Sequence, residues 1–389
     1  MQPKTFLVLG GYGNSGLALA RLLLRFSDCR LVLAGRNLQR AEAAAAGLNA
    51  EFSGMRVKGI RLDATDTAAL KPAFAGMDMA VAASSTARCA GAVAAAALEA
   101  GSDYLDIQLS SEEKLAALNA LRPQILNAGR CFITDGGFHP GLPAVMIRHA
   151  AQQFDRLTSA NIGSLLKVNW ADLHFSEATL REFADEITRE IANPRPAIYR
   201  DKMWRKAGMF SAKDYPAFDF GTAFGKRRCA PMFLEEMRYL PEMFPALQET
   251  AFYVSGFNWF VDGVVFPLLM AGVKIHPQGK FAALGNLLIW GLRRFSKPPY
   301  NNILKLEARG EKAGKPAYRE LRISHEDGYL LTAAPVAACL LQYLDGTIRQ
   351  PGLWLMAHLV EPGRLLEDLV RMGISVEWKK GEPAEKRVG

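Results

Sequence analysis

The chain has 389 residues, of which 50% are hydrophobic and 22% charged, with a formal net charge of +8. This length and composition can supply more than one well-packed core, which excludes a globally disordered protein. Lysine and arginine are spread along the sequence without long basic runs, so we expect no nucleic-acid partner. The five cysteines lie far apart, and therefore neither a disulfide framework nor a metal site is expected.

The first 137 residues alternate between short apolar runs and helical stretches. The apolar runs predict strands buried on both faces, over 5–10, 29–36, 55–63, 78–85, 103–109 and 130–137. The stretches between them predict helices, over 15–26, 37–48, 67–77, 88–101 and 111–129. Gly47 is a plausible stop for the second helix. The alternation predicts right-handed βαβ units, and hence an α/β fold with a Rossmann doubly wound parallel sheet.

The pattern changes after about residue 143, where an inserted mixed α/β substrate domain is expected. A strand is predicted over 158–170, an amphipathic helix over 176–193 and an antiparallel hairpin over 303–324. Two apolar runs, 263–273 and 281–292, are too short to span a bilayer. We interpret them as buried helices or a subunit interface and do not expect membrane contact, although a lipid-facing wall stays an alternative.

The C-terminal part begins with a helix over 332–346 that is apolar almost all round and must therefore be buried. It is expected to pack against the first domain. The predicted division is a Rossmann domain over 1–145, a second domain with substrate and dimerisation contacts over 146–328, a returning C-terminal segment over 329–378 and a flexible tail over 379–389. The N-terminus lacks a signal-peptide pattern, which favours a cytoplasmic location, and we expect a homodimer.

A glycine motif follows the first predicted strand. Its residues fit G-x-G-x-x-G and are Gly11, Tyr12, Gly13, Asn14, Ser15 and Gly16. In such a loop the first glycine permits a tight turn, the second lets a pyrophosphate approach the backbone, and the third lets the helix pack on the strand. The free amide groups at the helix N-terminus then bind the anion. The motif predicts a dinucleotide site.

The end of the second strand indicates which dinucleotide binds. NAD enzymes usually carry an acid there, but this chain has Arg36 followed by Asn37. A guanidinium can hold a 2′-phosphate, so NADP is the predicted cofactor and NAD stays possible. Asp63, followed by Ala64 at the end of the third strand, could face the adenine edge.

These motifs together resemble the saccharopine dehydrogenase family. The resemblance rests on "LGGYGNSG", "LAGR", "LDATD", "YLDIQ" and "DGGFHPGLP", with the C-terminal "HEDGYLLTAAPVAACLLQYLDGTI" and "LVEPGRLLEDLVRMGI". It covers about the first 145 residues and, less closely, the last 65, but not the middle. It implies an NAD(P)-dependent oxidoreductase whose relatives transfer hydride at carbon–nitrogen bonds, some of them reducing lipid intermediates instead.

Ligands of an open parallel sheet lie beyond the carboxyl ends of its strands, which nominates Ser84, Ser85, Asp106 and Asp135. Hydride transfer needs a group that manages the accompanying proton, and His139 is the best candidate because imidazole titrates near neutral pH. Asp106 and Asp135 could orient His139 or bind a substrate ammonium.

The resemblance therefore implies hydride transfer at an imine or amine centre of a small-molecule substrate. A lipid-intermediate reductase, or a catalytically silent NADP-binding protein that engages a partner or a membrane surface, are the alternatives. His139 could also have a purely structural role in its loop.

Overall fold

The computed structural model describes residues 3–84, 87–170, 195, 197–208, 211–276 and 282–381. The chain divides into two compact units: unit 1 comprises residues 1–149, 234–236 and 329–374, and unit 2 comprises 150–233, 237–328 and 375–389. The helix predicted over 176–193, residue Ser85 and residues 382–389 of the predicted tail lie outside the described residues. Residues 379–381 of that tail instead belong to a strand that ends at Gly381.

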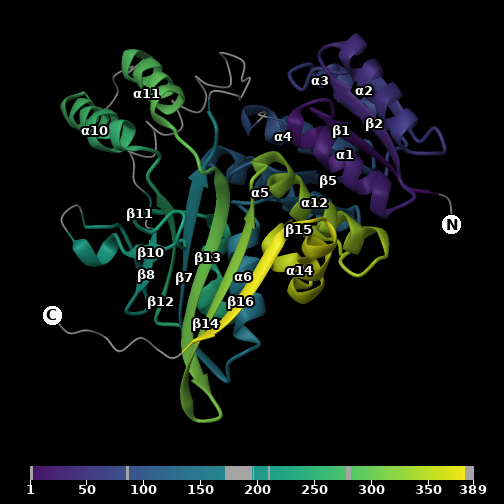
Figure 1. Ribbon diagram of the computed structural model, residues 1–389. Coiled ribbons are helices and arrows are strands. Elements are labelled where there is room, and N and C mark those ends of the chain that lie inside the picture. Colours follow the sequence, from purple (N-terminus) through teal and green to yellow (C-terminus); the bar gives the residue numbers. More distant parts are fainter. Residues whose placement is uncertain are drawn as a thin grey trace. The chain divides into compact units, whose positions relative to one another are not determined.

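Unit 1 is built on a seven-stranded sheet in which every pair of neighbouring strands is parallel. The strand order is β15-β6-β5-β4-β1-β2-β3, so the order reverses between β1 and β4. Figure 1 labels β1, β2, β5 and β15 of this sheet. The strands are β1 (Thr5–Leu9), β2 (Arg30–Gly35), β3 (Val57–Arg61), β4 (Met79–Ala82), β5 (Asp103–Asp106), β6 (Cys131–Thr134) and β15 (Gly352–Leu355). This arrangement confirms the predicted Rossmann fold.

Helices accompany the strands of this sheet, and α1 to α5 each connect one strand to the next, as the alternating pattern predicts. They are α1 (Asn14–Phe26), α2 (Leu38–Glu51), α3 (Thr67–Phe74), α4 (Ala90–Glu99), α5 (Glu112–Asn127), α6 (Leu142–Ala151), α12 (Gly328–Leu344), α13 (Met356–Leu359) and α14 (Pro362–Arg371), with a 3₁₀ turn over Ala87–Cys89. The helix stop expected at Gly47 is wrong, because α2 continues to Glu51. Gly47 is exposed and a Cβ there would meet nothing within 4 Å, so the helix tolerates it.

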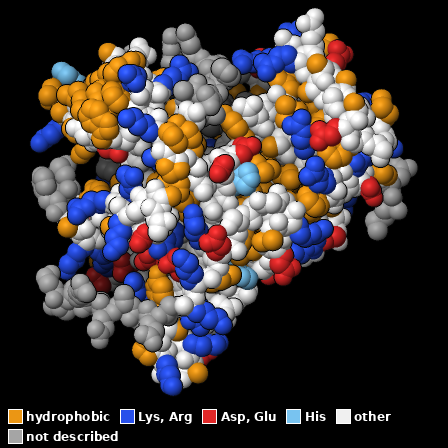
Figure 2. All heavy atoms as spheres, viewed as in Figure 1, with side chains coloured by type: hydrophobic (Ala, Val, Ile, Leu, Met, Phe, Trp, Pro, Cys, Tyr) orange, Lys and Arg blue, Asp and Glu red, His pale blue; other side chains and the backbone are white. Residues whose placement is uncertain are grey.

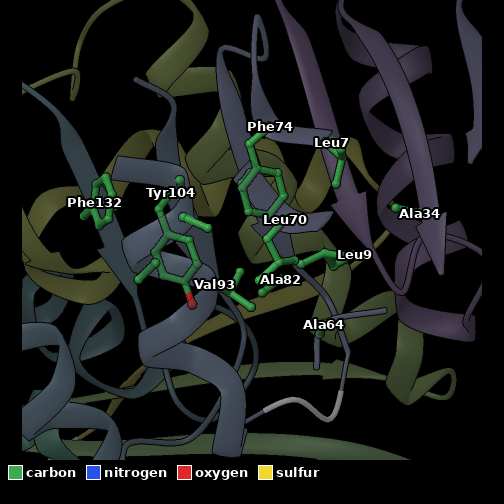
Figure 3. Packing of buried hydrophobic residues seen from close by; sticks show 14 of the residues in the cluster. Leu7, Leu9, Ala34, Ala64, Leu70, Phe74, Ala82, Val93, Tyr104 and Phe132 are labelled. Atoms are coloured by element: carbon green, nitrogen blue, oxygen red, sulfur yellow. The ribbon is translucent and has the colours of Figure 1, made fainter. Parts of the chain in front are cut away.

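One face of the sheet carries a continuous apolar core (Figure 3). Leu7 and Leu9 of β1 alternate toward this face, because successive side chains of a strand point to opposite sides. Phe74 of α3 and Val93 of α4 pack against them, and Tyr104 of β5 extends the cluster. The helices α3, α4 and α5 thus cover this face.

The C-terminal segment of unit 1 adds a strand to the sheet and contributes a buried helix to the unit. β15 pairs with β6 in parallel, from Gly352 beside Cys131 onward. Eleven residues of α12 are buried, as an all-apolar helix requires. Its Tyr343 hydroxyl donates to Asp103 over 2.6 Å, and its ring lies 6.0 Å from that of Phe6.

Unit 2 contains a nine-stranded mixed sheet in which β7 and β12 are parallel and the other paired strands antiparallel. The main path runs β10-β11-β12-β7-β13-β14-β16, with β8 and β9 off it. The strands are β7 (Arg156–Lys167), β8 (Ile198–Arg200), β9 (Met203–Arg205), β10 (Ala217–Asp219), β11 (Lys226–Met232), β12 (Glu249–Ser255), β13 (Asn301–Lys312), β14 (Lys315–His325) and β16 (Ser375–Gly381). The predicted hairpin is confirmed as β13 and β14, joined at Ala313 and Gly314, which both have positive φ.

Short helices complete the described chain. They are η2 (Ala212–Asp214), α8 (Glu235–Arg238), α9 (Leu240–Met243), the π-helical η3 (Val261–Val265), α10 (Phe266–Ile275) and α11 (Ala282–Phe295). Within the described residues, we find no helix with the length and apolar character needed to cross a membrane.

Candidate active site

The predicted site residues gather at the carboxyl edge of the unit 1 sheet. β1 leads into the glycine loop, β2 into Arg36, β4 into Ser84, β5 ends at Asp106 and β6 leads into Asp135. Because all seven strands are parallel, these positions share one edge, and the order reverses there between β1 and β4. Dinucleotides bind at such a reversal point.

The glycine loop turns one residue earlier than the motif suggests. Gly10, not Gly11, has a positive φ, of 77°. A Cβ at Gly11 would lie 2.8 Å from the Val8 carbonyl oxygen, so this position also excludes a side chain. A Cβ at Gly16 would collide with the backbone of Gly10, which confirms the close helix–strand contact predicted for the third glycine.

Gly13 and the start of α1 form the part of the loop that fits a phosphate. A Cβ at Gly13 would meet only the Gly10 carbonyl oxygen, at 3.1 Å, so space beside it is open. Gly13 is the N-cap of α1 and offers no side-chain cap, and the first turn, with Asn14 and Ser15, has no acidic residue. Unsatisfied amide groups and the helix dipole therefore favour an anion here.

Tyr12 folds over the end of β2. Its ring occupies the space that a side chain at Gly35 would need, and the Arg40 guanidinium lies 5.0 Å from the ring centre. The Tyr12 hydroxyl accepts a hydrogen bond from the Asn37 amide at 3.0 Å. The Asn37 side chain in turn caps α2 by accepting from the Arg40 amide. Asn37 thus has a structural partner already, which the motif did not reveal.

Arg36 is exposed at the end of β2, where a 2′-phosphate could reach it. Asp63, after β3, accepts hydrogen bonds from the amide and hydroxyl of Thr65. These bonds, with smaller contributions from Arg36 and Arg61, lower the pKa of Asp63. Ala64 beside it is buried. Asp63 is therefore an acid near Arg36 whose carboxylate is engaged by Thr65. The end of β2, where Arg36 lies, carries no acid.

Hydrogen bonds and packing connect the glycine loop with β6 along the edge. Gly10 lies so close to Ser84 that a Cβ atom added at Gly10 would be 2.7 Å from the Ser84 Cβ atom. The Gln108 side-chain amide donates to the Ser84 carbonyl at 3.0 Å. The Gln108 carbonyl accepts from the Lys114 ammonium, which also binds Asp135. The loops after β1, β4, β5 and β6 thus belong to one connected network.

A buried ion cluster lies at the centre of this network. The Lys114 Nζ atom lies 2.7 Å from Asp106 Oδ1 and 2.8 Å from Asp135 Oδ1, and none of these three side chains has exposed surface. The Ser110 hydroxyl donates to Asp135 at 2.7 Å, and Thr134 donates to Asp106 at 2.8 Å. Both carboxylates are therefore fully engaged within unit 1.

Burial and charge act against each other in this cluster. Burial raises the pKa of Asp135, and the Lys114 ammonium only partly opposes that shift. Burial lowers the pKa of Lys114, but the two carboxylates outweigh it and the net shift is upward. Lys114 is consequently a permanent cation, and the cluster holds one cation between two acids.

The loop after β6 carries His139. It starts at Asp135, which has a positive φ of 57°, and its first amide, that of Gly136, donates to the Asp106 carbonyl at 2.9 Å. The His139 ring is half-buried and meets Phe138 edge-on, with ring centres 4.7 Å apart. Its Nδ1 atom is buried, and burial lowers the pKa of His139 to about 4.

Glu236 fixes the other end of this loop. Its carboxylate accepts from the amides of Gly141 and Ala144 and so caps the start of α6. Burial raises the pKa of Glu236 to about 8, and Asp135 adds to the shift. His358 approaches the Glu236 carbonyl with its Nε2 atom at 2.8 Å.

Sequence reasoning missed Lys114 and Glu236. Lys114 follows Ser111, Glu112 and Glu113, and such a run is typical of the solvated start of a helix. Glu236 lies in "FLEEMRYL", within the region predicted as the second domain. Neither position has a local signal, because their burial depends on chain segments distant in the sequence.

Comparisons with known proteins agree with this geometry. Residues 6–132 match the family model described as the saccharopine dehydrogenase NADP binding domain. Among curated proteins, no sequence match was found. The apo saccharopine dehydrogenase (L-Glu forming) from Saccharomyces cerevisiae has a similar structure, with a TM-score of 0.66 over 97% of this chain and 100% of that chain at 16% identity. At that identity the likeness shows the fold.

Two further structures are more distant. A DAP dehydrogenase from C. glutamicum, in complex with DAP, has a TM-score of 0.46 at 12% identity, covering 95% of this chain and 99% of its own. An amine dehydrogenase from Mycobacterium smegmatis has a TM-score of 0.47 at 12% identity, covering 93% and 98%. Neither likeness is strong enough to carry an argument. The family match identifies residues 6–132 as an NADP-binding domain of the saccharopine dehydrogenase type, and together with the shared fold it supports an NADP-dependent oxidoreductase.

Proposed function

We propose that the chain catalyses hydride transfer at a carbon–nitrogen centre, between an amine and the corresponding imine of a small-molecule substrate. The observation that carries this proposal is the connected network from the glycine loop, through Ser84 and Gln108, to Lys114 and Asp135. It couples the predicted cofactor loop to the loop that carries the only proposed proton acceptor, His139.

The spacing of the strands suits a dinucleotide that crosses the edge. β1 and β6 are separated by β4 and β5, and three interstrand steps of about 4.8 Å span roughly 14 Å. A pyrophosphate at Gly13, with its adenosine half toward β2 and Arg36, leaves the nicotinamide half on the side of β4 to β6. Bound NADP would supply the hydride donor or acceptor.

His139 is proposed to accept the proton in the oxidative direction. As the substrate carbon loses hydride, the nitrogen lone pair forms the C=N bond and the nitrogen loses a proton. Burial keeps the ring neutral at pH 7, which a proton acceptor requires, but the same burial opposes the charge that the ring gains when it takes the proton.

Asp106 and Asp135 are proposed as positioning residues. Lys114, Ser110 and Thr134 occupy their oxygens, and neither carboxylate has exposed surface with which to contact a substrate ammonium. They hold the ends of β5 and β6 together. The loop that carries His139 starts at Asp135, so the contacts of the Asp135 carboxylate fix the start of that loop.

A panel assay tests the proposal. NADP reduction and NADPH oxidation would be followed by absorbance with amino acids, with keto acids plus amines, with polyamine aldehydes and with acyl or enoyl lipid substrates. Turnover confined to the amine and imine substrates is expected. Turnover of the lipid substrates alone would select the lipid-intermediate reductase, which the exposed apolar side chains of α10 and α11 favour. Tight NADPH binding without any turnover would indicate a silent binding protein.

We keep three further expectations as proposals: region 146–328 contributes substrate and subunit contacts, the protein forms a homodimer, and it is cytoplasmic. A light-scattering mass measures the oligomeric state directly. Fluorescence microscopy of a tagged chain tests the location.

A further inference from the structure

The helices η3, α10 and α11 of unit 2 have a small core of their own. Val261, Val265, Leu269, Leu288 and Leu292 are buried in it, at 1% exposure or less. Their spacing places one stripe of α10 and one of α11 inward. Phe266 of α10 and Leu284 and Leu287 of α11 pack against this core while partly buried, and other apolar side chains of the same helices are exposed.

The outward side chains are large and apolar. Of the fourteen exposed large hydrophobic residues in the described chain, six lie between 259 and 290: Trp259, Val264, Leu268, Met270, Ile275 and Trp290. Exposure reaches 68% for Trp259 and 71% for Ile275. Leu268, Ala271 and Ile275 follow helical spacing and form a single exposed stripe of α10. Figure 2 shows hydrophobic side chains gathered over α10.

Burial within the domain, one of the two outcomes expected from the sequence, holds among the described residues for only part of each helix, and the other expected outcome, a subunit interface, stays a prediction. Within the described residues, one stripe of each helix is buried, and the other apolar side chains of the two helices are half-buried or exposed. The exposed residues, which we call the apolar face, need another partner to leave water.

Cations surround the apolar face. Lys274, Arg293, Arg294 and Lys297 are exposed, and none of them forms an ion pair within the described part of the chain. The one acid among the described residues from 257 to 300 is Asp262, whose carboxylate accepts the Phe257 amide. Figure 2 shows Lys and Arg side chains next to the hydrophobic patch.

We propose that the apolar face docks on an anionic lipid surface, with α10 and α11 lying in the plane of the interface. Apolar residues would enter the boundary of headgroups and acyl chains while the four cations meet lipid phosphates. Trp259 and Trp290 suit this depth because an indole is apolar in its body and polar at its N–H. The two rings pack around Phe260 and Phe295, with Phe260–Phe295 centres 4.8 Å apart, which makes the aromatic group rigid.

Charge argues against a second copy of the chain as the occupant. A two-fold interface would place the apolar face against itself, and so bring two sets of the same four cations together with one acid each. An anionic membrane surface instead complements those cations. Lipid docking therefore accounts for both the apolar side chains and the charge.

Vesicle flotation of the full-length protein tests this proposal. Vesicles of phosphatidylcholine alone would be compared with vesicles that contain about one third phosphatidylglycerol. Binding to the anionic vesicles only, weakened by added salt, is expected. Leu268→Ser with Ile275→Ser should weaken binding about tenfold or more, whereas Met55→Ser with Met203→Ser, exposed elsewhere, should leave it unchanged.

The cations have a matched test. Arg293→Gln with Arg294→Gln should weaken binding about fivefold for each charge removed, whereas Lys226→Gln with Arg228→Gln on β11 should have little effect. Failure of the parent protein to float, or flotation that the Leu268 and Ile275 changes do not affect, would overturn the proposal. A light-scattering dimer that the same two changes dissociate would show that a second copy covers the apolar face instead.

Discussion

Lys114 donates a hydrogen bond to Asp135 over 2.8 Å, and neither side chain has any exposed surface. Asp106 accepts from the same ammonium at 2.7 Å. Taking charged groups out of water is costly, and the cost is offset only while each charge has its partner. The ends of β5 and β6 therefore depend on one lysine that the sequence places at the start of a helix.

Replacing this lysine should destabilise the protein strongly. Lys114→Met leaves two buried carboxylates without a cation, and the expected loss of unfolding free energy is about 3–5 kcal/mol. Lys71→Met breaks an ion pair with Glu99 whose side chains are 58% and 61% exposed, and should cost about 0–1 kcal/mol. Urea unfolding measures both. Adding Asp135→Asn to Lys114→Met should restore part of the loss, and equal destabilisation by the two lysine changes would refute the buried-charge account.

The glycine loop gives a second matched pair. Gly16→Ala places a methyl group against the Gly10 backbone, so the loop must shift. The expected result is a loss of about 1–3 kcal/mol in unfolding free energy and at least a tenfold weaker NADPH affinity. Gly47→Ala, where a Cβ meets nothing, should stabilise the protein by about 0.5–1 kcal/mol. Unchanged NADPH binding in Gly16→Ala, measured by calorimetry, would contradict the predicted role of this loop.

Cofactor choice depends on Arg36. A charge-assisted contact with the 2′-phosphate contributes about 1.5–3 kcal/mol, which is roughly tenfold to a hundredfold in affinity. Arg36→Asp should therefore weaken NADPH binding by that factor and leave NADH binding little changed. Arg30→Asp, at the opposite end of β2 and also exposed, is the control. Equal affinities of the parent protein for NADPH and NADH would remove the basis for this assignment.

The regular parts of the fold could be predicted from the sequence because their signals are local. Buried parallel strands are short apolar runs, and the glycine motif lies directly between β1 and α1. The all-apolar α12 predicts its own burial. A local signal can also mislead. Gly47 predicts the end of a helix, but an exposed glycine is tolerated inside a helix, and α2 continues to Glu51.

The ion cluster and the apolar face could not be predicted, because each depends on contacts between distant segments. In the sequence, Lys114 lies 21 residues from Asp135, and Glu236 lies 95 residues from Gly141, whose amide donates a hydrogen bond to the Glu236 carboxylate. The apolar runs of α10 and α11 read as core helices, yet only the three-dimensional packing shows which stripe finds a partner. The ion cluster and the apolar face thus depend on contacts that no local pattern in the sequence specifies.

Glu236 should make stability depend on pH. Its pKa is raised by burial from 4.5 to about 8, so the folded state holds a proton that the unfolded state releases. Stability from this group is then greatest below pH 4.5 and falls as pH rises toward 8, by up to about 1.4 kcal/mol per pH unit. Glu236→Gln keeps an acceptor for the α6 amides and removes the titration. Relative to the parent protein, this variant should gain stability steadily from pH 5 to pH 8, and a constant difference would show that Glu236 is not protonated in the fold.

His139 gives the sharpest test of the proposed chemistry, once the substrate panel has supplied a reaction. His139→Gln should lower turnover by about 10²–10⁴-fold while the NADPH dissociation constant stays unchanged. His325→Gln is the control, because the Nδ1 atom of that ring accepts a hydrogen bond from the Asp327 amide within a turn of unit 2.

The pH profile of the reaction separates a catalytic role of His139 from a role in loop structure. Since burial lowers the pKa of His139 to about 4, the ring stays a neutral base down to that pH. Amine oxidation at saturating substrate should therefore not lose rate to His139 protonation until pH approaches 4. A rate loss with a midpoint near 6.5 that disappears in His139→Gln would mean that the working ring is solvated, and turnover unchanged by the substitution would return His139 to a structural role.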